Sequence, residues 1–271
     1  MKLPRANNIF KILVQGHFPR SKVLLKWHPS SRQLPEEIQK QIEIFWQKEI
    51  IQTNKNSHIF NGKLVRLNDW SIQNELLTLD MGLTDYKELL YSNHNLKNLQ
   101  KHGKWALSRA LGVSVVFETC DKQILLIERS QKVGEFPGCL DVLGGHIDPD
   151  NDRVNDVPDP FFAIKNEIKE EIKISFEENA PLVCLGLIET VSTRKPEMVF
   201  WTRSKYSARE ILTMNADNSS EEFVRLFSIQ NDPDTLQAVL LNWRTPWSPS
   251  AYGVLNLYLK ALEEKEIGKQ L

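Results

Sequence analysis

The chain has few cysteines, no long hydrophobic run and almost no net charge, and each shortage removes a class of protein. Cys120, Cys139 and Cys184 are isolated and odd in number, so we expect free thiols in a reducing compartment rather than disulfides or a zinc site. No apolar run approaches the roughly 20 residues of a membrane-spanning helix. A formal net charge of -1 gives no broad basic surface, which argues against nucleic acid or an anionic membrane as a partner.

The remaining composition is that of an ordinary globular protein. Its 271 residues, 41% hydrophobic and 25% charged, suffice for one large domain or two modest ones. The apolar stretch near the amino terminus is interrupted by Lys11 and makes a poor signal peptide, so we expect a cytoplasmic or otherwise intracellular protein. The sequence contains no internal repeat, no low-complexity segment and no obvious flexible linker near residue 105.

The first third predicts short strands mixed with helices. Residues 9–15 and 22–27 are strand-like, and residues 84–92 predict a short helix capped by Thr84. The pair Asn61-Gly62 tolerates positive φ and predicts a hairpin turn. Residues 34–50 predict a helix whose apolar stripe is formed by Ile38, Ile42, Phe45 and Trp46.

From about Leu107 the pattern changes to a succession of strands with helices between and after them. A helix is expected from about Asp159 to residue 174, and a last helix begins after Ser248, its expected cap, with Pro249 in the first turn. This arrangement predicts an α/β or α+β sandwich. The strand-like segments are 111–117, 123–129, 139–145, 182–189 and 197–204.

Three glutamates share one face of the helix that follows the acidic loop. In "FFAIKNEIKEEIKI", Glu167, Glu170 and Glu171 stand at positions i, i+3 and i+4. Carboxylates so close raise each other's pKa unless a cation neutralises them, and Mg²⁺ prefers oxygen ligands. The alternative is a solvated face balanced by Lys165, Lys169 and Lys173.

The sequence around this helix resembles the Nudix box. "GGHIDP" is similar to the opening of the box and "AIKNEIKEEIKI" to its second half. Gly145 matches the leading glycine, Glu167 the glutamate that follows the arginine, and the next two glutamates the pair after it. Asn166 stands where the arginine is usual, Lys173 where a late glycine is usual, and the intervening loop is longer than in the common box. The first glutamate of the box has no clear counterpart; the nearest acids are Asp156 and Asp159.

The wider chain resembles one divergent Nudix branch, the hydrolases that split UDP-glucose and UDP-galactose. The resemblance extends outside the box, to "HIFNGKLVRL", "DMGLTDYKELLYSN", "RALGVSVVF", "IERSQKVGEFPGCLDVLGGHIDP" and "TPWSPSAYGVLNLYL". It implies an α/β fold: a Nudix α/β/α sandwich with a mixed sheet over residues 106–271. A smaller α+β amino-terminal domain, residues 1–105, would precede it, pack beside the active site and restrict the substrate.

The resemblance also implies an activity, the Mg²⁺-dependent hydrolysis of a UDP-sugar to UMP and a sugar 1-phosphate. It places Mg²⁺, or Mn²⁺ in its stead, on Glu167, Glu170 and Glu171 with help from the Gly144 carbonyl. One of these catalytic glutamates would also serve as the base for the attacking water. A distant acid from a later loop often completes such sites, and Glu221, with Glu222 as its alternative, is the candidate unless loop solvation explains both.

Three basic residues are candidates for binding the substrate phosphates. Arg129 precedes the turn into the Gly-Gly strand and presents a guanidinium fork, although a surface ion pair would explain it equally. Arg194 and Lys195 form a basic pair near a strand end. Mg²⁺ prefers oxygen, so His146 is expected to be a turn residue rather than a metal ligand. We expect the polar loop 149–158 to project into solvent without a role in the core.

Two other functions remain open on the sequence alone. One is a Nudix hydrolase for another conjugate such as ADP-ribose. The other is a nucleotide-sugar binding module without turnover, which Asn166 and the missing first glutamate of the box would favour. Retention of the three helix carboxylates argues against the binding module, because a pure binder could lose some of them freely.

Overall fold

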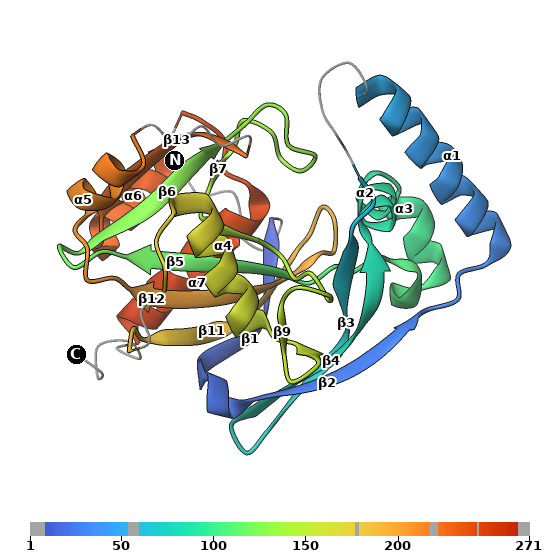
Figure 1. The fold of residues 1–271 in the computed structure, drawn as a ribbon, viewed down its shortest axis with the longest axis horizontal. Coiled ribbons are helices and arrows are strands. Elements are labelled where there is room, and N and C mark those ends of the chain that lie inside the picture. The colour runs from blue at the N-terminus through green and yellow to red at the C-terminus, as the bar shows by residue number, and fades with distance from the viewer. Residues whose placement is uncertain (1–8, 54–59, 177–178, 217–221, 243, 265–271) are drawn as a thin grey trace.

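Two β-sheets organise the chain, as the ribbon in Figure 1 shows. The structure, a computed structural model, describes residues 9–53, 60–176, 179–216, 222–242 and 244–264. The large sheet has the order β1 (Phe10–Pro19), β11 (Leu182–Thr190), β12 (Pro196–Arg203), β5 (Gly112–Glu118), β6 (Gln123–Arg129) and β13 (Phe223–Gln230). Short β7 (Leu140–Asp141) pairs with β6, and β8 (Leu143–His146) pairs with β5. The sheet is mixed, because β12 and β5 run parallel whereas their other neighbours are antiparallel.

Helices cover both faces of the large sheet. Helix α4 (Pro160–Ile172) lies on one face, while α6 (Pro233–Asn242) and α7 (Pro249–Glu263) lie on the other. Successive strand residues point to opposite faces, so Val115 packs in the core cluster of α4 and Val116 in that of α7. The expected α/β sandwich with a mixed sheet is confirmed. Helix α5 (Ala208–Met214), helix α6 and strand β13 were not predicted from the sequence.

The ends of α4 and α7 follow from local sequence. Asp159 caps α4 by accepting hydrogen bonds from the backbone N–H groups of Phe161 and Phe162, with Pro160 in the first turn. The helix ends where Lys173 adopts a left-handed conformation with φ 58°. Ser248 caps α7 by accepting from the backbone N–H of Ala251, as predicted.

The second sheet belongs to the amino-terminal part and has the order β2 (Val23–Ser31), β4 (Leu76–Asp85), β3 (Lys63–Gln73). Helices α1 (Glu36–Thr53), α2 (Tyr86–His94) and α3 (Leu96–Leu99) accompany it. Leu67 and Leu79 of this sheet share one hydrophobic cluster with Val113 of β5 and with α4. The second sheet and the large sheet therefore pack together around a common core.

Three local predictions for the amino-terminal part need comment. The hairpin turn lies at Asn74-Glu75, both with positive φ, so the prediction at Asn61-Gly62 is wrong. Asp85, not Thr84, caps α2 by accepting from the backbone N–H of Glu88. The apolar stripe of α1 is confirmed: Ile38, Ile42 and Trp46 are buried, and Phe45 packs against them.

Strand β1 extends the large sheet although it lies far from the other strands in sequence. It pairs antiparallel with β11, from Phe10 opposite Thr190 to Pro19 opposite Val183. Residues 10–19 thus reach across to the half of the chain expected to hold the active site. In the described part of the chain, no helix is long and apolar enough to cross a membrane.

Most of the acidic loop is exposed, as predicted, but the loop also takes part in the core, so the prediction that it has no role there is wrong. It forms a hairpin of β9 (Arg153–Val154) and β10 (Val157–Pro158), and Val157 packs against the core cluster. Asp152 is buried. Its carboxylate accepts hydrogen bonds from the backbone N–H of Asp148 at 2.8 Å and from Asn166 Nδ2 at 2.7 Å. A loop that carries these bonds holds the start of α4 in place.

Candidate active site

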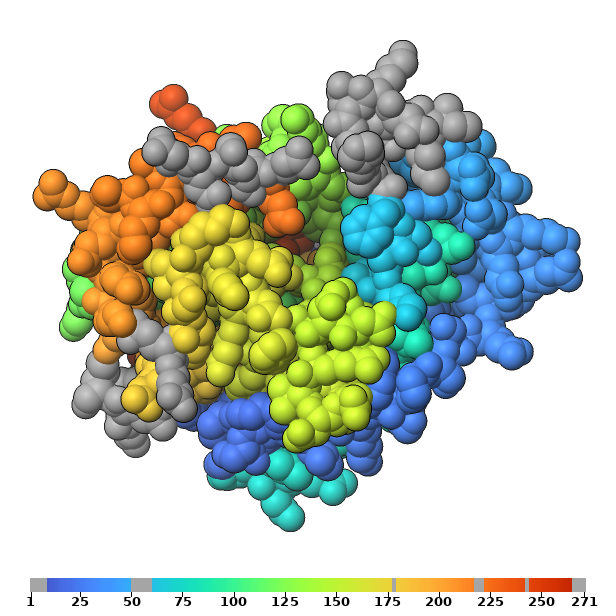
Figure 2. Space-filling view, in the orientation of Figure 1, coloured from blue at the N-terminus to red at the C-terminus, as the bar shows by residue number. Residues whose placement is uncertain are grey.

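Helix α4 and strand β8 bring the predicted carboxylates against the Gly-Gly turn. Glu171 is buried, with 5% of its surface exposed, Glu167 is partly buried and Glu170 is exposed. Ile164, Ile168 and other apolar residues of the helix enter the core, which fixes the direction in which the glutamates point. In Figure 2 the face that bears α4, in yellow, is hollowed between this helix and the region of α2, in cyan.

The two glycines allow the close approach of β8 to its neighbours. Gly144 has φ 153°, and a Cβ there would lie 2.2 Å from the Val113 carbonyl oxygen. A Cβ on Gly145 would lie 2.1 Å from Glu167 Oε1. Gly144 therefore permits the pairing with β5, and Gly145 leaves room for a carboxylate.

Backbone N–H groups of β8 hold two of the glutamates. The Gly144 N–H donates to Glu171 Oε2 at 3.0 Å, and the His146 N–H donates to the Glu167 carboxylate. A carboxylate that accepts one such bond keeps further lone pairs for another partner. His146 itself is the last residue of β8, not part of a turn.

Both held glutamates resist ionisation. Burial raises the pKa of Glu167 to about 8, and the charges of Glu222 and Glu170 add to the effect. Burial likewise raises the pKa of Glu171 well above its usual value, with Glu167 and Glu222 adding to it. Glu222 therefore lies close enough to couple with both, whereas Glu221 lies outside the described residues. Groups with pKa values perturbed in this way cluster at functional sites.

The donor chemistry of this cluster suits a hard divalent cation. As they stand, no three or more His, Cys, Asp or Glu side chains of the described residues are arranged to hold a metal ion. The cluster nevertheless consists of oxygen donors that are crowded and buried, and that ionise with difficulty in the absence of a cation. A divalent cation would relieve this repulsion, and Mg²⁺ and Mn²⁺ both accept carboxylate oxygens. The residues present therefore fit such an ion.

Arg129 lies beside the carboxylate cluster. Its Nη1 is 3.2 Å from Asp141 Oδ2, and its Nε donates to the Glu135 carbonyl oxygen at 3.1 Å. Burial opposes its charge, but nearby carboxylates, Asp141 first among them and Glu171 included, raise its pKa. The guanidinium is thus a fixed positive charge near the glutamates, with 22% of its side chain exposed.

Arg194 and Lys195 point to different carboxylate partners. Arg194 Nε pairs with Glu189 Oε1 at 2.8 Å, and the same carboxylate binds Arg109 through its other oxygen, also at 2.8 Å. Lys195 turns inward, and its Nζ lies 3.1 Å from Glu135 Oε2. Neither cation is free of carboxylate partners, and only Lys195 lies next to β8.

Around the glutamates, Asn166 and Asp159 have structural partners, whereas Glu135 and Glu197 are buried residues that the sequence did not single out. Asn166, which stands where the box usually has an arginine, binds Asp152 of the hairpin. Asp159, a candidate for the missing first glutamate, is the cap of α4 and pairs with Arg20 at 2.7 Å. Glu135 and Glu197 are buried beside Lys195, and their one sequence signal is the position of Glu135 between Gly134 and Pro137.

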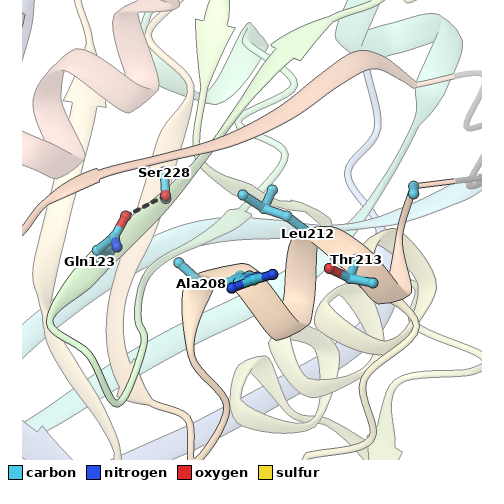
Figure 3. Close-up of a pocket in the computed structure, with 7 residues that line it drawn as sticks. Gln123, Ala208, Leu212, Thr213 and Ser228 are labelled. Atoms are coloured by element: carbon cyan, nitrogen blue, oxygen red, sulfur yellow. Dashed lines mark hydrogen bonds between the residues drawn. The ribbon is translucent and has the colours of Figure 1, made fainter.

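A separate surface pocket lies away from this cluster, between α5 and strands β6 and β13 (Figure 3). Leu212 and Thr213 come from the helix, and Gln123 accepts a hydrogen bond from Ser228 across the two strands. No candidate catalytic residue lines it. Its lining residues are Gln123, Ala208, Arg209, Leu212, Thr213, Ala216 and Ser228.

Comparison of the sequence with known proteins finds relatives that are named as Nudix hydrolases or UDP-glucose pyrophosphatases. No protein-family model matches it. Nudix hydrolase 9 of Arabidopsis thaliana is 27% identical over 58% of this chain and 61% of its own length. Uridine diphosphate glucose pyrophosphatase NUDT22 of Mus musculus is 26% identical over 67% of each chain. The chain is therefore similar to Nudix hydrolases over about three fifths to two thirds of its length.

The chain also resembles the NUDT22 proteins of other species. The NUDT22 protein of Homo sapiens is 35% identical over 27% of each chain. The chain spans about three fifths of the plant relative, or 61% of its length. The α4 glutamates and the Gly-Gly strand therefore lie in a chain whose named relatives include a Nudix hydrolase and a UDP-glucose pyrophosphatase.

Proposed function

We propose that the chain is a divalent-metal-dependent hydrolase that splits the diphosphate of a UDP-sugar, UDP-glucose or UDP-galactose, into UMP and a sugar 1-phosphate. The observation that carries the proposal is the pair of partly buried Glu167 and buried Glu171, which lie against β8 and have raised pKa values. Stability alone gives no reason to bury two neighbouring carboxylates. The resemblance to NUDT22, named as a uridine diphosphate glucose pyrophosphatase, supports the choice of substrate.

Each residue of the cluster has a proposed task. Glu167, Glu170 and Glu171 would hold Mg²⁺ or Mn²⁺, with the Gly144 carbonyl and an acid from residues 221–222 completing the set. When bound, the ion would neutralise the diphosphate and lower the pKa of a water molecule for attack. One of these glutamates, ionised while it holds the cation, would also accept the proton of that water.

Arg129 is the proposed phosphate contact of the chain itself. Its guanidinium is held by Asp141 and by a carbonyl oxygen, and its remaining N–H groups can bind phosphate oxygens in a fixed geometry. Arg194 and Lys195 are each engaged with a different carboxylate, which leaves Arg129 as the stronger candidate.

A substrate panel tests the proposal. The full-length protein is incubated with Mg²⁺ and, separately, with UDP-glucose, UDP-galactose and ADP-ribose, and the products are separated by chromatography. We expect UMP and a sugar 1-phosphate from one or both UDP-sugars, with one phosphoanhydride bond broken and one water consumed. AMP from ADP-ribose as the main product would favour the alternative Nudix activity. Nucleotide binding without any product would favour the binding module.

A further inference from the structure

The carboxylate of Glu135 bridges the amino-terminal part and the Gly-Gly strand. Its Oε1 accepts a hydrogen bond from Asn93 Nδ2 of α2 at 2.9 Å. Its Oε2 lies 3.1 Å from Lys195 Nζ and 3.3 Å from Nε2 of His146, the last residue of β8. One side chain from the loop between β6 and β7 thus has one oxygen on each part of the protein.

These contacts form a closed, buried triangle. Lys195 Nζ lies 3.2 Å from His146 Nε2, which completes the third side. The side chains of Glu135 and Lys195 are each only 9% exposed. Glu197 approaches Lys195 to 3.7 Å from the other side and accepts a hydrogen bond from Ser114 at 2.6 Å. Burying such charges costs solvation energy, and a common use for a retained buried pair is to fix one geometry.

His146 connects this triangle to the catalytic cluster. Its ring belongs to the triangle, whereas its backbone N–H donates to the Glu167 carboxylate. The preceding residue, Gly145, is the one whose missing side chain leaves room for Glu167. The contacts therefore run from Asn93 through Glu135 and His146 to Glu167, across α2, the β6–β7 loop, β8 and α4.

We propose that Glu135 and Lys195 are positioning residues that fix His146, and with it the place of Glu167, relative to α2. In this role Lys195 is an internal counter-ion and does not contact the substrate phosphates. Residues that orient metal-binding groups typically contribute 10–100-fold to metal affinity or activity. The inference rests on the proposed hydrolase for its kinetic consequences, but the positioning itself is measurable without turnover.

Paired substitutions separate positioning from the cost of burying one charge. The variants are Lys195→Met, Glu135→Gln and the double variant, in which neither charge remains. Glu128→Gln is the control, because it removes a glutamate of β6 whose pair with Arg225, at 3.0 Å, lies far more exposed. Hydrogen exchange of residues 143–147 is followed in metal-free full-length protein. Residues 183–188 of β11, a strand that pairs with β1 and β12, are the internal reference. The kcat and KM for UDP-glucose are measured with Mg²⁺.

The two single variants should unfold at lower temperature, because each leaves a buried charge without its partner. The double variant should recover part of the lost melting temperature, because Glu197 still lacks Lys195 in it. It should nevertheless exchange residues 143–147 about 10-fold faster, with residues 183–188 unchanged, and its kcat should fall roughly 10–100-fold at a similar KM. Asn93→Ala should raise the same exchange by a smaller factor. Glu128→Gln should match the wild type throughout.

Other outcomes would overturn the proposal. Wild-type exchange of residues 143–147 in the double variant would show that the pair does not hold β8, and so would an equal rise in residues 183–188. A raised KM in Lys195→Met, with kcat and exchange unchanged, would make Lys195 a substrate ligand instead. Unchanged exchange in Asn93→Ala would remove α2 from the proposal. If the wild type splits no UDP-sugar, the proposed function fails, whereas the exchange comparison still decides the positioning.

Discussion

Gly145 and Glu167 lie so close that a Cβ on the glycine would be 2.1 Å from Glu167 Oε1. We therefore predict that Gly145→Ala displaces the Glu167 carboxylate and lowers kcat for UDP-glucose about 10-fold or more, as loss of ligand orientation does elsewhere. The control is Gly62→Ala, where the new methyl would meet only the exposed ring of Phe60 at 3.0 Å. Equal activity of Gly145→Ala and wild type would contradict the assigned place of Glu167.

The raised pKa of Glu167 predicts how stability depends on pH in metal-free protein. Its pKa is about 8 in the folded protein against 4.5 ordinarily, so between these values only the folded state keeps the proton. The free energy of unfolding should therefore fall as pH rises from about 4.5 to 8, by at most roughly 1.4 kcal/mol per pH unit for one group.

Urea unfolding at pH 5, 6.5 and 8 in the presence of a chelator measures this slope. Glu167→Gln should flatten it and should be more stable than the wild type at pH 8. Glu128→Gln should keep the wild-type slope. The same slope in Glu167→Gln and wild type would show that Glu167 ionises normally in the folded protein.

The elements predicted correctly from the sequence are those whose ends are set by neighbouring residues. Helix α4 begins after a proline and a capping aspartate, and Ser248 caps α7, so both starts can be read from a few adjacent residues. Spacing alone put Glu167 and Glu171 on one helical face. The hairpin was misplaced because Asn61-Gly62 favours a turn, whereas the chain turns at Asn74-Glu75 without a glycine.

What sequence could not predict depends on contacts between distant segments. The role of the β9–β10 hairpin follows from Asp152, whose partner Asn166 is 14 positions away on α4. The triangle around Lys195 takes its members from three separate segments, and Glu135 carries no motif that would place it there. The pairing of β1 with β11 likewise joins residues such as Phe10 and Thr190. Local propensity contains no information about such partners.

The buried contacts of the acidic loop predict that disturbing it lowers the free energy of unfolding. Asp152→Ala removes the acceptor of two hydrogen bonds and leaves the Asn166 amide without this partner, so the free energy of unfolding should fall by about 1–3 kcal/mol. Asp156→Asn, in the exposed turn of the same hairpin, should change it little, because Asn tolerates the positive φ of 63°. Chemical denaturation compares the two, and equal stability of both variants would restore the view of a dispensable loop.

The junction between the two parts contains a buried ion pair that should be sensitive to substitution. Arg109 Nη1 binds Glu189 at 2.8 Å, its Nε donates to the Leu67 carbonyl oxygen, and its side chain is 1% exposed. Glu189→Gln leaves this guanidinium buried without a carboxylate, which should cost about 3–5 kcal/mol. Glu75→Gln, which breaks an exposed pair with Lys22, should leave the urea midpoint unchanged. Equal midpoints for both variants would show that the buried pair contributes nothing to stability.

The most direct test of the central claim, that the α4 glutamates hold a divalent cation for diphosphate hydrolysis, is a Mg²⁺ titration of UMP release from UDP-glucose. Wild type, Glu170→Gln and Glu171→Gln are compared after chelator treatment, with melting temperatures recorded alongside. We predict that wild-type turnover requires Mg²⁺ and that turnover of both variants falls by orders of magnitude, because ligand loss weakens water activation and charge neutralisation. Gln has a helix propensity similar to that of Glu, so melting temperatures without metal should be equal or slightly higher. UMP release at wild-type rates by either variant, or wild-type turnover that is independent of added Mg²⁺, would contradict the account.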